Sequence, residues 1–327
     1  MHRASRAAHE RRARNRRRRQ RAMVAAGIIL LSVAALLAVM DATASGPAPA
    51  AKRPPRAKTT AVRPNSGYAV TPSPQQVRVK LNLPLRSGLL FDVRSGRVLW
   101  QRDPRQELPI ASLTKMMTAL IVITHARSSA KVLITPQAVH FTGSGVGLLP
   151  RGKRVPLLAL LYGLLLPSGN DAAIALAQHV AGTQARFIGM MNAEAQRLGL
   201  TCTHYTTVSG VVDQGNHSCA VDLAVIAHAL LGHPLLAKIV ASSSAVLPFP
   251  IKGRKLFLYN NNPLYAQDFP GTDGVKTGYT TKAGLCIVAT ARRGRHWLGV
   301  VLLHSGNWAT QAETLLDAGF AAERRRR

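Results

Sequence analysis

The sequence predicts an α+β fold in which an antiparallel sheet is flanked by helices and joined to a helical lobe. Two short apolar runs separated by a turn lie near residue 90, apolar segments with helical spacing follow from 112 to 231, and strand-like segments return after about 245. Strands that are separated in this way by a block of helices are typical of α+β folds. The chain has 327 residues, 47% of them hydrophobic, which suffices for one large domain with tails.

The individual elements follow from local patterns. Residues 87–101 carry the hairpin signal, with Arg94-Ser95-Gly96 between two apolar runs. Four stretches have the apolar spacing of helices: 112–125, 157–181, 184–199 and 221–231. Pro167 divides the second of these into two helices, because proline cannot continue the hydrogen-bond ladder of a helix interior, and Asn170-Asp171 is expected to cap the second half. Three strands and a last helix are expected at 273–280, 284–291, 296–304 and 308–319.

The first 66 residues predict three segments outside the domain. Residues 1–21 are rich in Arg, and residues 22–40 form an uncharged apolar stretch of the length that crosses a bilayer as a helix. Because Arg stays on the cytoplasmic side, residues 1–21 are expected there and the remainder outside the membrane. Residues 22–44 are therefore a signal or anchor segment, with retention as an anchor favoured and cleavage near Ala44 as the alternative. Residues 45–66, rich in Pro, Ala and basic residues, are expected to be a linker.

The catalytic domain is expected to span residues 67–322 and to be followed by a basic tail at 323–327. The formal net charge of +29 predicts attraction to polyanions. Nucleic acid is excluded as a partner because the apolar stretch at 22–40 directs the domain out of the cytoplasm. Attachment to the membrane through residues 22–40 is expected instead, and anionic lipid or an anionic cell wall fits the charge.

The cysteine and histidine content predicts no metal site. Cys202 and Cys219 flank a glycine-containing loop and could form a disulfide. The alternative is that these two cysteines and Cys286 are three buried free thiols. The chain has neither a C-x-x-C pair nor an H-E-x-x-H motif, which argues against a zinc carboxypeptidase. Four histidines are expected to be ordinary core or surface residues: His204, His217, His228 and His233.

The first motif with chemical meaning is Ser112-Leu113-Thr114-Lys115, at the expected start of a helix. A spacing of three residues places Ser112 and Lys115 on one helical face. A serine hydroxyl needs a base to become a nucleophile, and lysine serves only where burial or neighbouring positive charge lowers its pKa. Alone, the motif is equally consistent with a capping serine and a solvated lysine.

Two further short motifs follow along the chain. Ser168-Gly169-Asn170 lies in the break between two helices, where polar side chains reach a cleft edge. Lys276-Thr277-Gly278 lies on an expected strand, where a lysine can hold a substrate carboxylate and a glycine permits close approach of the backbone to the ligand. Each tripeptide is common alone, whereas the three together, in this order, are specific.

With these motifs the chain resembles the low-molecular-mass D-alanyl-D-alanine carboxypeptidases, peptidase family S11, from about residue 68 to 320. The matching stretches include LPIASLTKMMTAL, LLYGLLLPSGNDAAIALA and GTDGVKTGYTTKAGLC. The resemblance implies a single catalytic domain with the fold of serine β-lactamases and penicillin-binding transpeptidases. It implies the removal of the terminal D-alanine from peptidoglycan stem pentapeptides, with β-lactams as covalent inhibitors and no cofactor.

The resemblance also implies roles for individual residues. The catalytic residues would be Ser112, Lys115, Ser168 and Asn170, and the substrate-binding residues would be Lys276, Thr277, Gly278 and Tyr279. Ser112 would be acylated, Lys115 would accept its proton, and Ser168 would pass a proton to the leaving D-alanine. The backbone N–H groups of Ser112 and Tyr279 would form the oxyanion hole.

Departures from the family pattern and rival functions complete the prediction. No E-x-x-L-N sequence lies between residues 170 and 276, which argues against efficient β-lactamase activity. Ser209 stands where the family often has His. A D,D-endopeptidase that cuts cross-links with the same residues is one alternative, and a catalytically silent penicillin-binding module of the wall is another.

Overall fold

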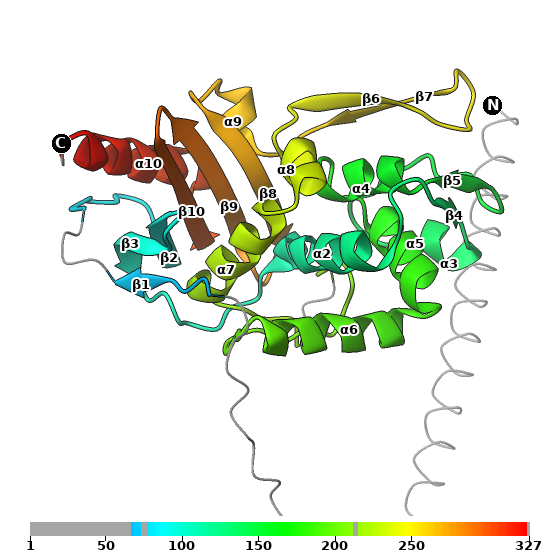
Figure 1. The fold of residues 1–327 in the computed structure, drawn as a ribbon, viewed down its shortest axis with the longest axis horizontal. Helices are drawn as coiled ribbons and strands as arrows, with labels where there is room; N and C mark the ends of the chain where they lie inside the picture. Colours follow the sequence, from blue (N-terminus) through cyan, green and yellow to red (C-terminus); the bar gives the residue numbers. More distant parts are fainter. Residues whose placement is uncertain (1–66, 73–76, 212–214, 326–327) are drawn as a thin grey trace, which may run out of the picture. The chain divides into compact units, whose positions relative to one another are not determined.

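The computed structural model describes residues 67–72, 77–211 and 215–325 (Figure 1). The three segments expected within residues 1–66, including the apolar stretch 22–40, lie outside the described residues. The expected domain, residues 67–322, therefore contains nearly everything that the structure describes. Its last helix extends to Arg325, into the stretch expected as a basic tail.

A six-stranded sheet forms the centre of the fold, in the order β1-β3-β2-β10-β9-β8. The strands are β1 (Thr71–Pro72), β2 (Leu85–Asp92), β3 (Arg97–Arg102), β8 (Thr272–Thr280), β9 (Gly284–Arg293) and β10 (His296–Ser305). The short β1 runs parallel to β3, and the other neighbours are antiparallel. The order places the C-terminal strands beside the N-terminal hairpin, which confirms the α+β prediction.

Side chains alternate between two hydrophobic clusters on the two faces of the sheet, as the period of two in a strand requires. On β10, Leu298, Val300 and Leu302 pack toward helix α10 (Trp308–Arg325), in one cluster. The neighbouring Val301 and Leu303 belong to the larger cluster, which continues into the helical lobe. Figure 1 shows α10 on one side of the sheet and the helices of the lobe on the other.

The helical lobe contains the predicted helices and several elements that the sequence did not predict. The predicted helices are α2 (Lys115–His125), α4 (Leu157–Leu165), α5 (Asn170–Ala181), α6 (Gln184–Arg197) and α7 (Ala220–Leu231). The additional elements are β4 (Lys131–Leu133), α3 (Pro136–Val139), β5 (Arg154–Pro156) and α8 (Pro234–Val240). Strands β6 (Ser244–Pro248) and β7 (Lys255–Tyr259) begin where strand-like segments were expected, after about 245. Helix α9 (Pro263–Ala266) was not predicted either, and its Leu264 belongs to the cluster with α10. Pro167 falls between α4 and α5, as expected. In the described part of the chain no single helix is long and apolar enough to cross a membrane. Only α7 and α8 taken together, bent by 109° at their junction, have the length and apolar composition of a span.

A disulfide joins Cys202 and Cys219, whose Cα atoms lie 5.6 Å apart. This resolves the two readings of the cysteine content. Cys286 is buried in β9 and lies outside the disulfide. The bond closes a loop of the chain that contains Ser209.

Candidate active site

The first motif lies on a tight turn that runs directly into α2. Residues Ala111–Thr114 form a 3₁₀ helix, and α2 begins at Lys115. Ala111 has a φ of +47°, in the left-handed region that costs energy for a residue with a Cβ atom. Through this turn the Nζ atom of Lys115 lies 2.8 Å from the Oγ atom of Ser112, within hydrogen-bond distance. The nucleophile and base of the sequence prediction are therefore in contact.

Lys115 lies in an environment that favours its neutral form. The side chain is fully buried, and burial is the main cause that holds its pKa well below the usual value of lysine. The nearby Lys276 lowers this pKa further, whereas Asp171 raises it. A neutral Nζ atom in contact with a serine hydroxyl can accept the hydroxyl proton, which is the requirement for general-base activation.

A loop at residues 206–210 supplies the second contact of Lys115. Nζ donates a hydrogen bond to the backbone oxygen of Ser209 at 2.8 Å. The Thr118 hydroxyl donates to the backbone oxygen of Val208 at 2.7 Å, so α2 holds this loop at two successive residues. Gly210 has a φ of +78°, and a Cβ atom there would lie 1.9 Å from the backbone oxygen of Ala111. The loop thus approaches the nucleophile turn as closely as a glycine permits.

Asn216 fixes the same loop from the other side. Its buried side-chain oxygen accepts hydrogen bonds from the backbone N–H groups of Thr206 and Thr207. Its amide nitrogen donates to the hydroxyls of Thr207, at 2.9 Å, and Thr114, at 3.2 Å. Because Thr114 belongs to the nucleophile turn, one amide side chain connects that turn to the loop that binds Lys115.

The second motif lies where α4 gives way to α5. Ser168 has a φ of +68°, and Asn170 is the first residue of α5. Both side chains are buried. The Oγ atom of Ser168 and the Oδ1 atom of Asn170 have no hydrogen-bond partner among the described residues. Buried polar atoms are nearly always paired, so these two atoms are candidates for groups that a substrate or water satisfies. The next residue, Asp171, is near enough to Lys115 to raise its pKa, which links this motif to the first.

Asp171 ties the second motif to a glycine-rich stretch at residues 143–147. Its carboxylate accepts hydrogen bonds from the backbone N–H groups of Val146 at 2.9 Å and Gly147 at 3.0 Å. Asn170 continues this contact, because its amide nitrogen donates to the backbone oxygen of Thr142. The expectation that Asn170-Asp171 caps α5 is wrong: Gly169 holds the N-cap position without a side-chain bond.

The third motif lies on the edge strand β8. Lys276, Thr277 and Gly278 are buried, whereas Tyr279 is 63% exposed at the rim. Burial lowers the pKa of Lys276 to about 7, and its Nζ atom donates to the backbone oxygen of Thr277 at 2.8 Å. A Cβ atom at Gly278 would lie 2.8 Å from the backbone nitrogen of Ser112. The structure thus shows a close approach of Gly278 to the nucleophile turn, whereas the close approach to a ligand stays a prediction.

Two asparagines connect the second motif to the third. Asn261 donates from its backbone to the oxygen of Leu166 at 3.1 Å and from its side chain to the oxygen of Pro167 at 3.1 Å. The amide of the neighbouring Asn262 donates to the backbone oxygen of Gly274, on β8, at 2.8 Å. The break before Ser168 and the strand that carries Lys276 are thus held by one short segment.

The three motifs therefore converge on one site that combines a serine in contact with a lysine, a second buried lysine and two polar atoms without partners. This set of groups suits acyl transfer to a serine. Within the described residues, the cluster with metal-ligand spacing is Cys202, Cys219 and Asp222, and its two sulfur atoms are joined in the disulfide. Asp171, Asn216 and the Ser209 carbonyl have no assigned site role from the sequence, because their parts depend on contacts with the backbone of other segments.

Comparison with known proteins gives a family match over most of the chain. Residues 74–307 match the family model of peptidase S11, D-alanyl-D-alanine carboxypeptidase. The D-alanyl-D-alanine carboxypeptidase DacB2 of Mycobacterium tuberculosis is 37% identical over 246 residues, which cover 73% of this chain and 83% of that protein. DacF of Bacillus subtilis is 33% identical over 214 residues, 64% of this chain and 54% of that protein. The chain thus spans about half the length of DacF.

Solved structures agree with the sequence comparison. The Streptomyces K15 DD-transpeptidase superposes with a TM-score of 0.70 at 29% identity, over 75% of this chain and all of that one. The carboxypeptidase from Mycobacterium tuberculosis superposes with a TM-score of 0.69 at 35% identity, over 75% of this chain and 96% of that one. The chain belongs to the D-alanyl-D-alanine carboxypeptidase family, peptidase family S11.

Proposed function

We propose that this protein is a serine D,D-carboxypeptidase that removes the terminal D-alanine from peptidoglycan stem pentapeptides and so limits cross-linking. One observation carries the proposal: the Ser112 Oγ atom lies 2.8 Å from the Nζ atom of a fully buried Lys115 whose pKa is lowered. Family membership and the names of the relatives support this substrate.

In the acylation step, the Ser112 oxygen attacks the carbonyl carbon between the two terminal D-alanines while Lys115 accepts the hydroxyl proton. The negative charge of the tetrahedral intermediate is held by the backbone N–H groups of Ser112 and Tyr279. The distance of 2.8 Å between the Nζ atom of Lys115 and the Oγ atom of Ser112 supports this role for Lys115.

Collapse of the intermediate breaks the C–N bond and leaves an ester on Ser112. The departing amine needs a proton, which Ser168 passes on through its buried, unpaired hydroxyl. The terminal carboxylate of the substrate lies beside Lys276 and Thr277, where its charge raises the pKa of Lys276 and keeps the ammonium form. Water then hydrolyses the ester. A β-lactam, which imitates the dipeptide, acylates Ser112 in the same way.

Transfer to an amine in place of water is the second candidate reaction. The similarity to the Streptomyces K15 DD-transpeptidase, at a TM-score of 0.70, favours it. Both reactions share the acylation of Ser112 and differ only in the acceptor. Adding an amine such as glycylglycine to the assay distinguishes them, because transpeptidation forms a new peptide product while it consumes the acyl-enzyme.

The place of action is part of the proposal. The Arg-rich residues 1–21 followed by the apolar residues 22–40 support an N-terminal anchor that holds the domain on the outer side of the cell membrane. Cleavage near Ala44 would release the protein to the wall instead. Fractionation of cells that express the chain with a C-terminal tag tests this: a full-length band in the membrane fraction, digested by external protease, is expected. A cytoplasmic full-length band would contradict it.

The deciding experiment measures D-alanine release from a pentapeptide that ends in D-Ala-D-Ala, with the wild-type chain and with Ser112→Ala. Release by the wild type and none by the variant is the expected result. Thermal unfolding of both proteins checks that the variant is folded. A folded wild-type protein that releases no D-alanine would overturn the proposal.

A further inference from the structure

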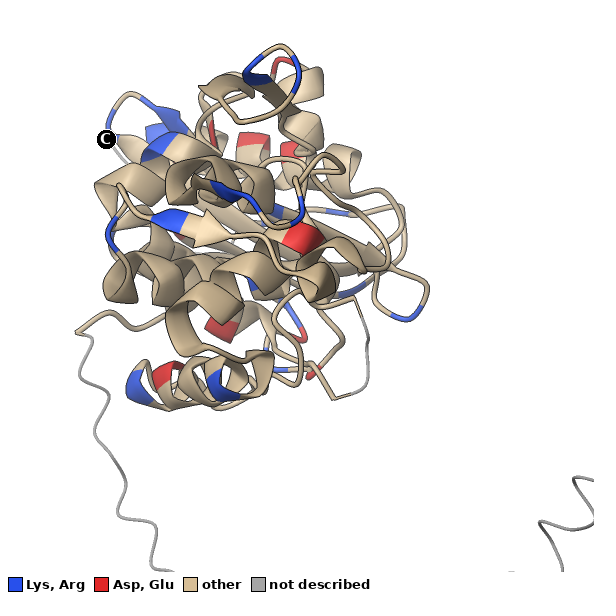
Figure 2. Cartoon of the chain, turned by 90° about the vertical axis from the view of Figure 1, so that its right-hand side faces the viewer, with Lys and Arg blue, Asp and Glu red and all other residues tan. Residues whose placement is uncertain are grey.

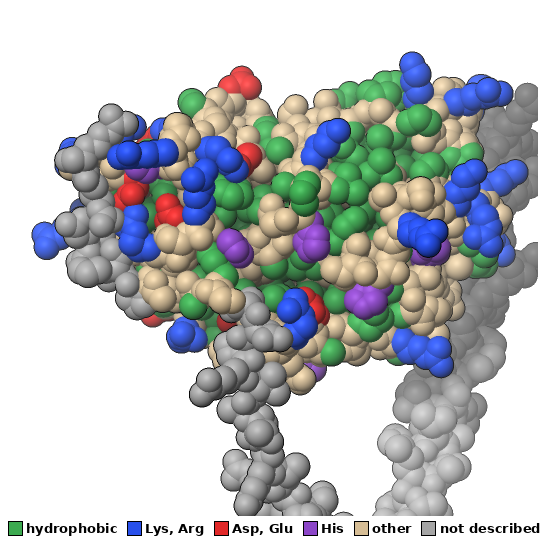
Figure 3. Space-filling view, in the orientation of Figure 1, with side chains coloured by type: hydrophobic (Ala, Val, Ile, Leu, Met, Phe, Trp, Pro, Cys, Tyr) green, Lys and Arg blue, Asp and Glu red, His purple; other side chains and the backbone are tan. Residues whose placement is uncertain are grey.

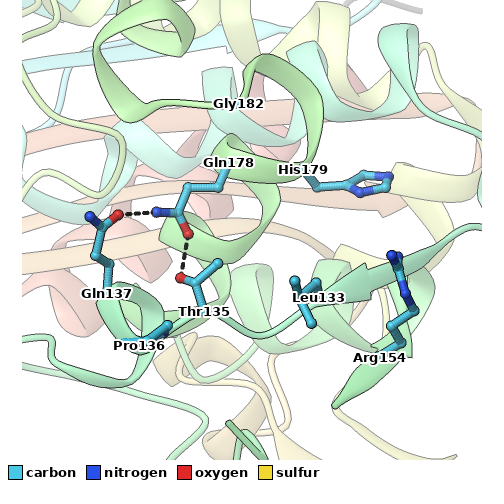
Figure 4. Close-up of a pocket in the computed structure, with 8 residues that line it drawn as sticks. All are labelled: Leu133, Thr135, Pro136, Gln137, Arg154, Gln178, His179 and Gly182. Atoms are coloured by element: carbon cyan, nitrogen blue, oxygen red, sulfur yellow. Dashed lines mark hydrogen bonds between the residues drawn. The ribbon is translucent and has the colours of Figure 1, made fainter. Parts of the chain in front are cut away.

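A cavity of about 500 Å³ lies in the helical lobe, between the β4–β5 pair, helix α3 and the end of α5. Its lining residues are Leu133, Thr135, Pro136, Gln137, Arg154, Gln178, His179 and Gly182 (Figure 4). None of these residues belongs to the three catalytic motifs. A cavity of this volume accommodates a small ligand or a short stretch of a polymer.

One wall of the cavity is fixed by a chain of hydrogen bonds. The Thr135 hydroxyl donates to the side-chain oxygen of Gln178 at 2.7 Å, and it also accepts from the backbone N–H of Ala138 as the cap of α3. The amide nitrogen of Gln178 donates to the side-chain oxygen of Gln137. These bonds hold the amide groups in place before any ligand arrives (Figure 4). Amides and hydroxyls fixed in this way suit the hydroxyl and acetamido groups of sugars.

The opposite side of the cavity carries a guanidinium group and an imidazole ring, both of which are suited to anions. Arg154 pairs directly with Leu133 across the β4–β5 ladder, and both side chains are exposed. His179 lies in the last turn of α5. Figure 4 shows the guanidinium group of Arg154 and the ring of His179 on the same side of the cavity, beside Leu133. The ion pairs among the described residues include neither of them. A guanidinium group without a carboxylate partner is suited to a carboxylate from a ligand.

The surroundings extend this positive charge. Four exposed basic residues lie on the neighbouring segments: Arg127, Lys131, Arg151 and Lys153. No Asp or Glu occurs between residues 108 and 170. Figure 2 turns this side of the molecule toward the viewer, and in Figure 3 the described residues of the right-hand part show blue side chains with no red among them. The field at the cavity is therefore positive and attracts an anionic polymer.

Helix α5 connects this cavity to the active site. It begins at Asn170, in the second motif, and ends at Ala181, beside the cavity. Twelve residues at a rise of about 1.5 Å per residue span roughly 18 Å. The cavity is thus separate from the site of acyl transfer, and helix α5 fixes the distance between the two. A site that docks the polymer carrying the substrate requires such a fixed distance.

We propose that the cavity binds a stretch of peptidoglycan glycan that carries no stem peptide, with its free sugar carboxylate at Arg154 and His179 and the sugar polar groups at Gln178 and Gln137. The inference rests on the proposed function, since that function defines the polymer met by the enzyme. Leu133 and Pro136 supply apolar surface for the face of a sugar ring. Other sugars of the same strand carry stem peptides, so binding at this second point raises the local concentration of those peptides at Ser112.

The test compares the full-length wild-type chain with Arg154→Gln and with the matched control Arg295→Gln. Arg295 is exposed in the turn between β9 and β10, so both variants lose one surface charge. The probes are glycan oligosaccharides freed of peptide, with a carboxylate on every second sugar, and chitotetraose, a neutral amino-sugar oligomer. Binding is measured by calorimetry at fixed ionic strength, and D-alanine release from a soluble pentapeptide is measured beside it.

Arg154→Gln is expected to weaken binding of the carboxylated glycan about tenfold or more, the effect of losing a charged hydrogen bond. Arg295→Gln should leave binding unchanged, chitotetraose should bind more weakly than the carboxylated glycan, and both variants should retain D-alanine release. Equal loss of glycan binding in the two variants would show that the effect depends only on the overall charge of the protein, and it would overturn the inference. Arg154-dependent binding to anionic lipid vesicles without glycan binding would also overturn it. Glycan binding without D-alanine release by the wild type would sink the proposed function and leave the cavity assignment standing.

Discussion

The Nζ atom of Lys115 donates a hydrogen bond to the backbone oxygen of Ser209, 2.8 Å away, while it lies at the same distance from Ser112. The residue at position 209 thus acts through its main chain. This gives a physical reason why Ser209 can stand where the family often has His. Any side chain that fits the buried position leaves the carbonyl in place.

Ser209→Ala is therefore expected to acylate at a rate within about twofold of the wild type, because a backbone carbonyl is unaffected by loss of the side-chain hydroxyl. The measurement is the rate of labelling by a fluorescent penicillin, with Lys115→Ala as the control that should lose labelling. A large fall for Ser209→Ala would show that the hydroxyl itself takes part in the chemistry.

Asn216→Ala should lower the acylation rate although Asn216 touches neither Ser112 nor Lys115 in any described contact. The substitution removes the bonds that hold Thr207 and Thr114 and releases the loop that presents the Ser209 carbonyl. Displacement of catalytic groups by about 1 Å can cost up to roughly 100-fold in rate. Penicillin labelling over a range of pH measures it, and the profile should move as the environment of Lys115 changes.

The control for Asn216→Ala is Asn82→Ala, at an exposed position. Loss of stability alone would lower the melting temperature of Asn216→Ala without moving its pH profile. That result would assign Asn216 a purely structural part.

The strongest periodic patterns predicted their elements well. The hairpin at 87–101, the division at Pro167 and the three C-terminal strands all appear in the structure, since hydrophobic periodicity and proline act locally. The short elements β4, α3, β5 and α9 were missed because they have three or four residues each, too few for a period to show, and the seven-residue α8 was missed as well.

For the site, the three motifs marked the residues that meet. The supporting residues could not be found in the same way. Asp171 holds the backbone N–H of Val146, 25 residues away, and Asn216 bonds the hydroxyl of Thr114, 102 residues away. No sequence pattern encodes such contacts. The failed expectation of a cap at Asn170-Asp171 has the same origin, because Asp171 bonds the stretch at Val146 and Gly147.

Lys276→Met is expected to stabilise the fold at neutral pH while it abolishes carboxypeptidase activity. Burial lowers the pKa of Lys276 to about 7, whereas a lysine in the unfolded chain titrates near 10.4. Between these values the unfolded state binds one more proton than the folded state, so stability rises with pH across this window. The destabilisation is complete below about pH 7 and disappears above about pH 10.

The melting temperature of Lys276→Met should therefore exceed that of the wild type at pH 7 and rise less between pH 7 and 10. Lys255→Met, on the exposed edge of β7, is the control and should follow the wild-type curve. Parallel curves for Lys276→Met and the wild type would show that Lys276 does not titrate in this window.

Reduction of the Cys202–Cys219 disulfide should lower both stability and acylation. The bond closes a separation of 17 residues, and loops of about this length lose roughly 3 kcal/mol of stability on reduction. The closed stretch contains Ser209 and Asn216, so loosening it also affects Lys115. Thermal unfolding with and without reductant measures the effect. The Cys202→Ser/Cys219→Ser double variant should match the reduced wild type and be insensitive to reductant, and an unchanged reduced wild type would contradict the prediction.

Gly278→Ala should abolish most acylation through a single added methyl group. That methyl would lie 2.8 Å from the backbone nitrogen of Ser112 and 3.0 Å from the backbone oxygen of Ile110, and backbone atoms cannot move aside as a flexible side chain does. Strand β8 must then retreat from the nucleophile turn, which separates Lys276 and the backbone N–H of Tyr279 from Ser112. A fall of roughly 100-fold in penicillin labelling is expected from such a displacement.

The matched substitution is Gly189→Ala, in helix α6, where a Cβ atom would meet nothing within 4 Å. Alanine favours a helix over glycine by about 1 kcal/mol, so this variant should gain slightly in melting temperature and label normally. Because the added methyl in Gly278→Ala crowds the turn that carries Ser112, the labelling rate should fall much more than the melting temperature. Equal labelling by the two variants would mean that β8 can move without disturbing Ser112, and that the contact between Gly278 and the nucleophile turn is not required for acyl transfer.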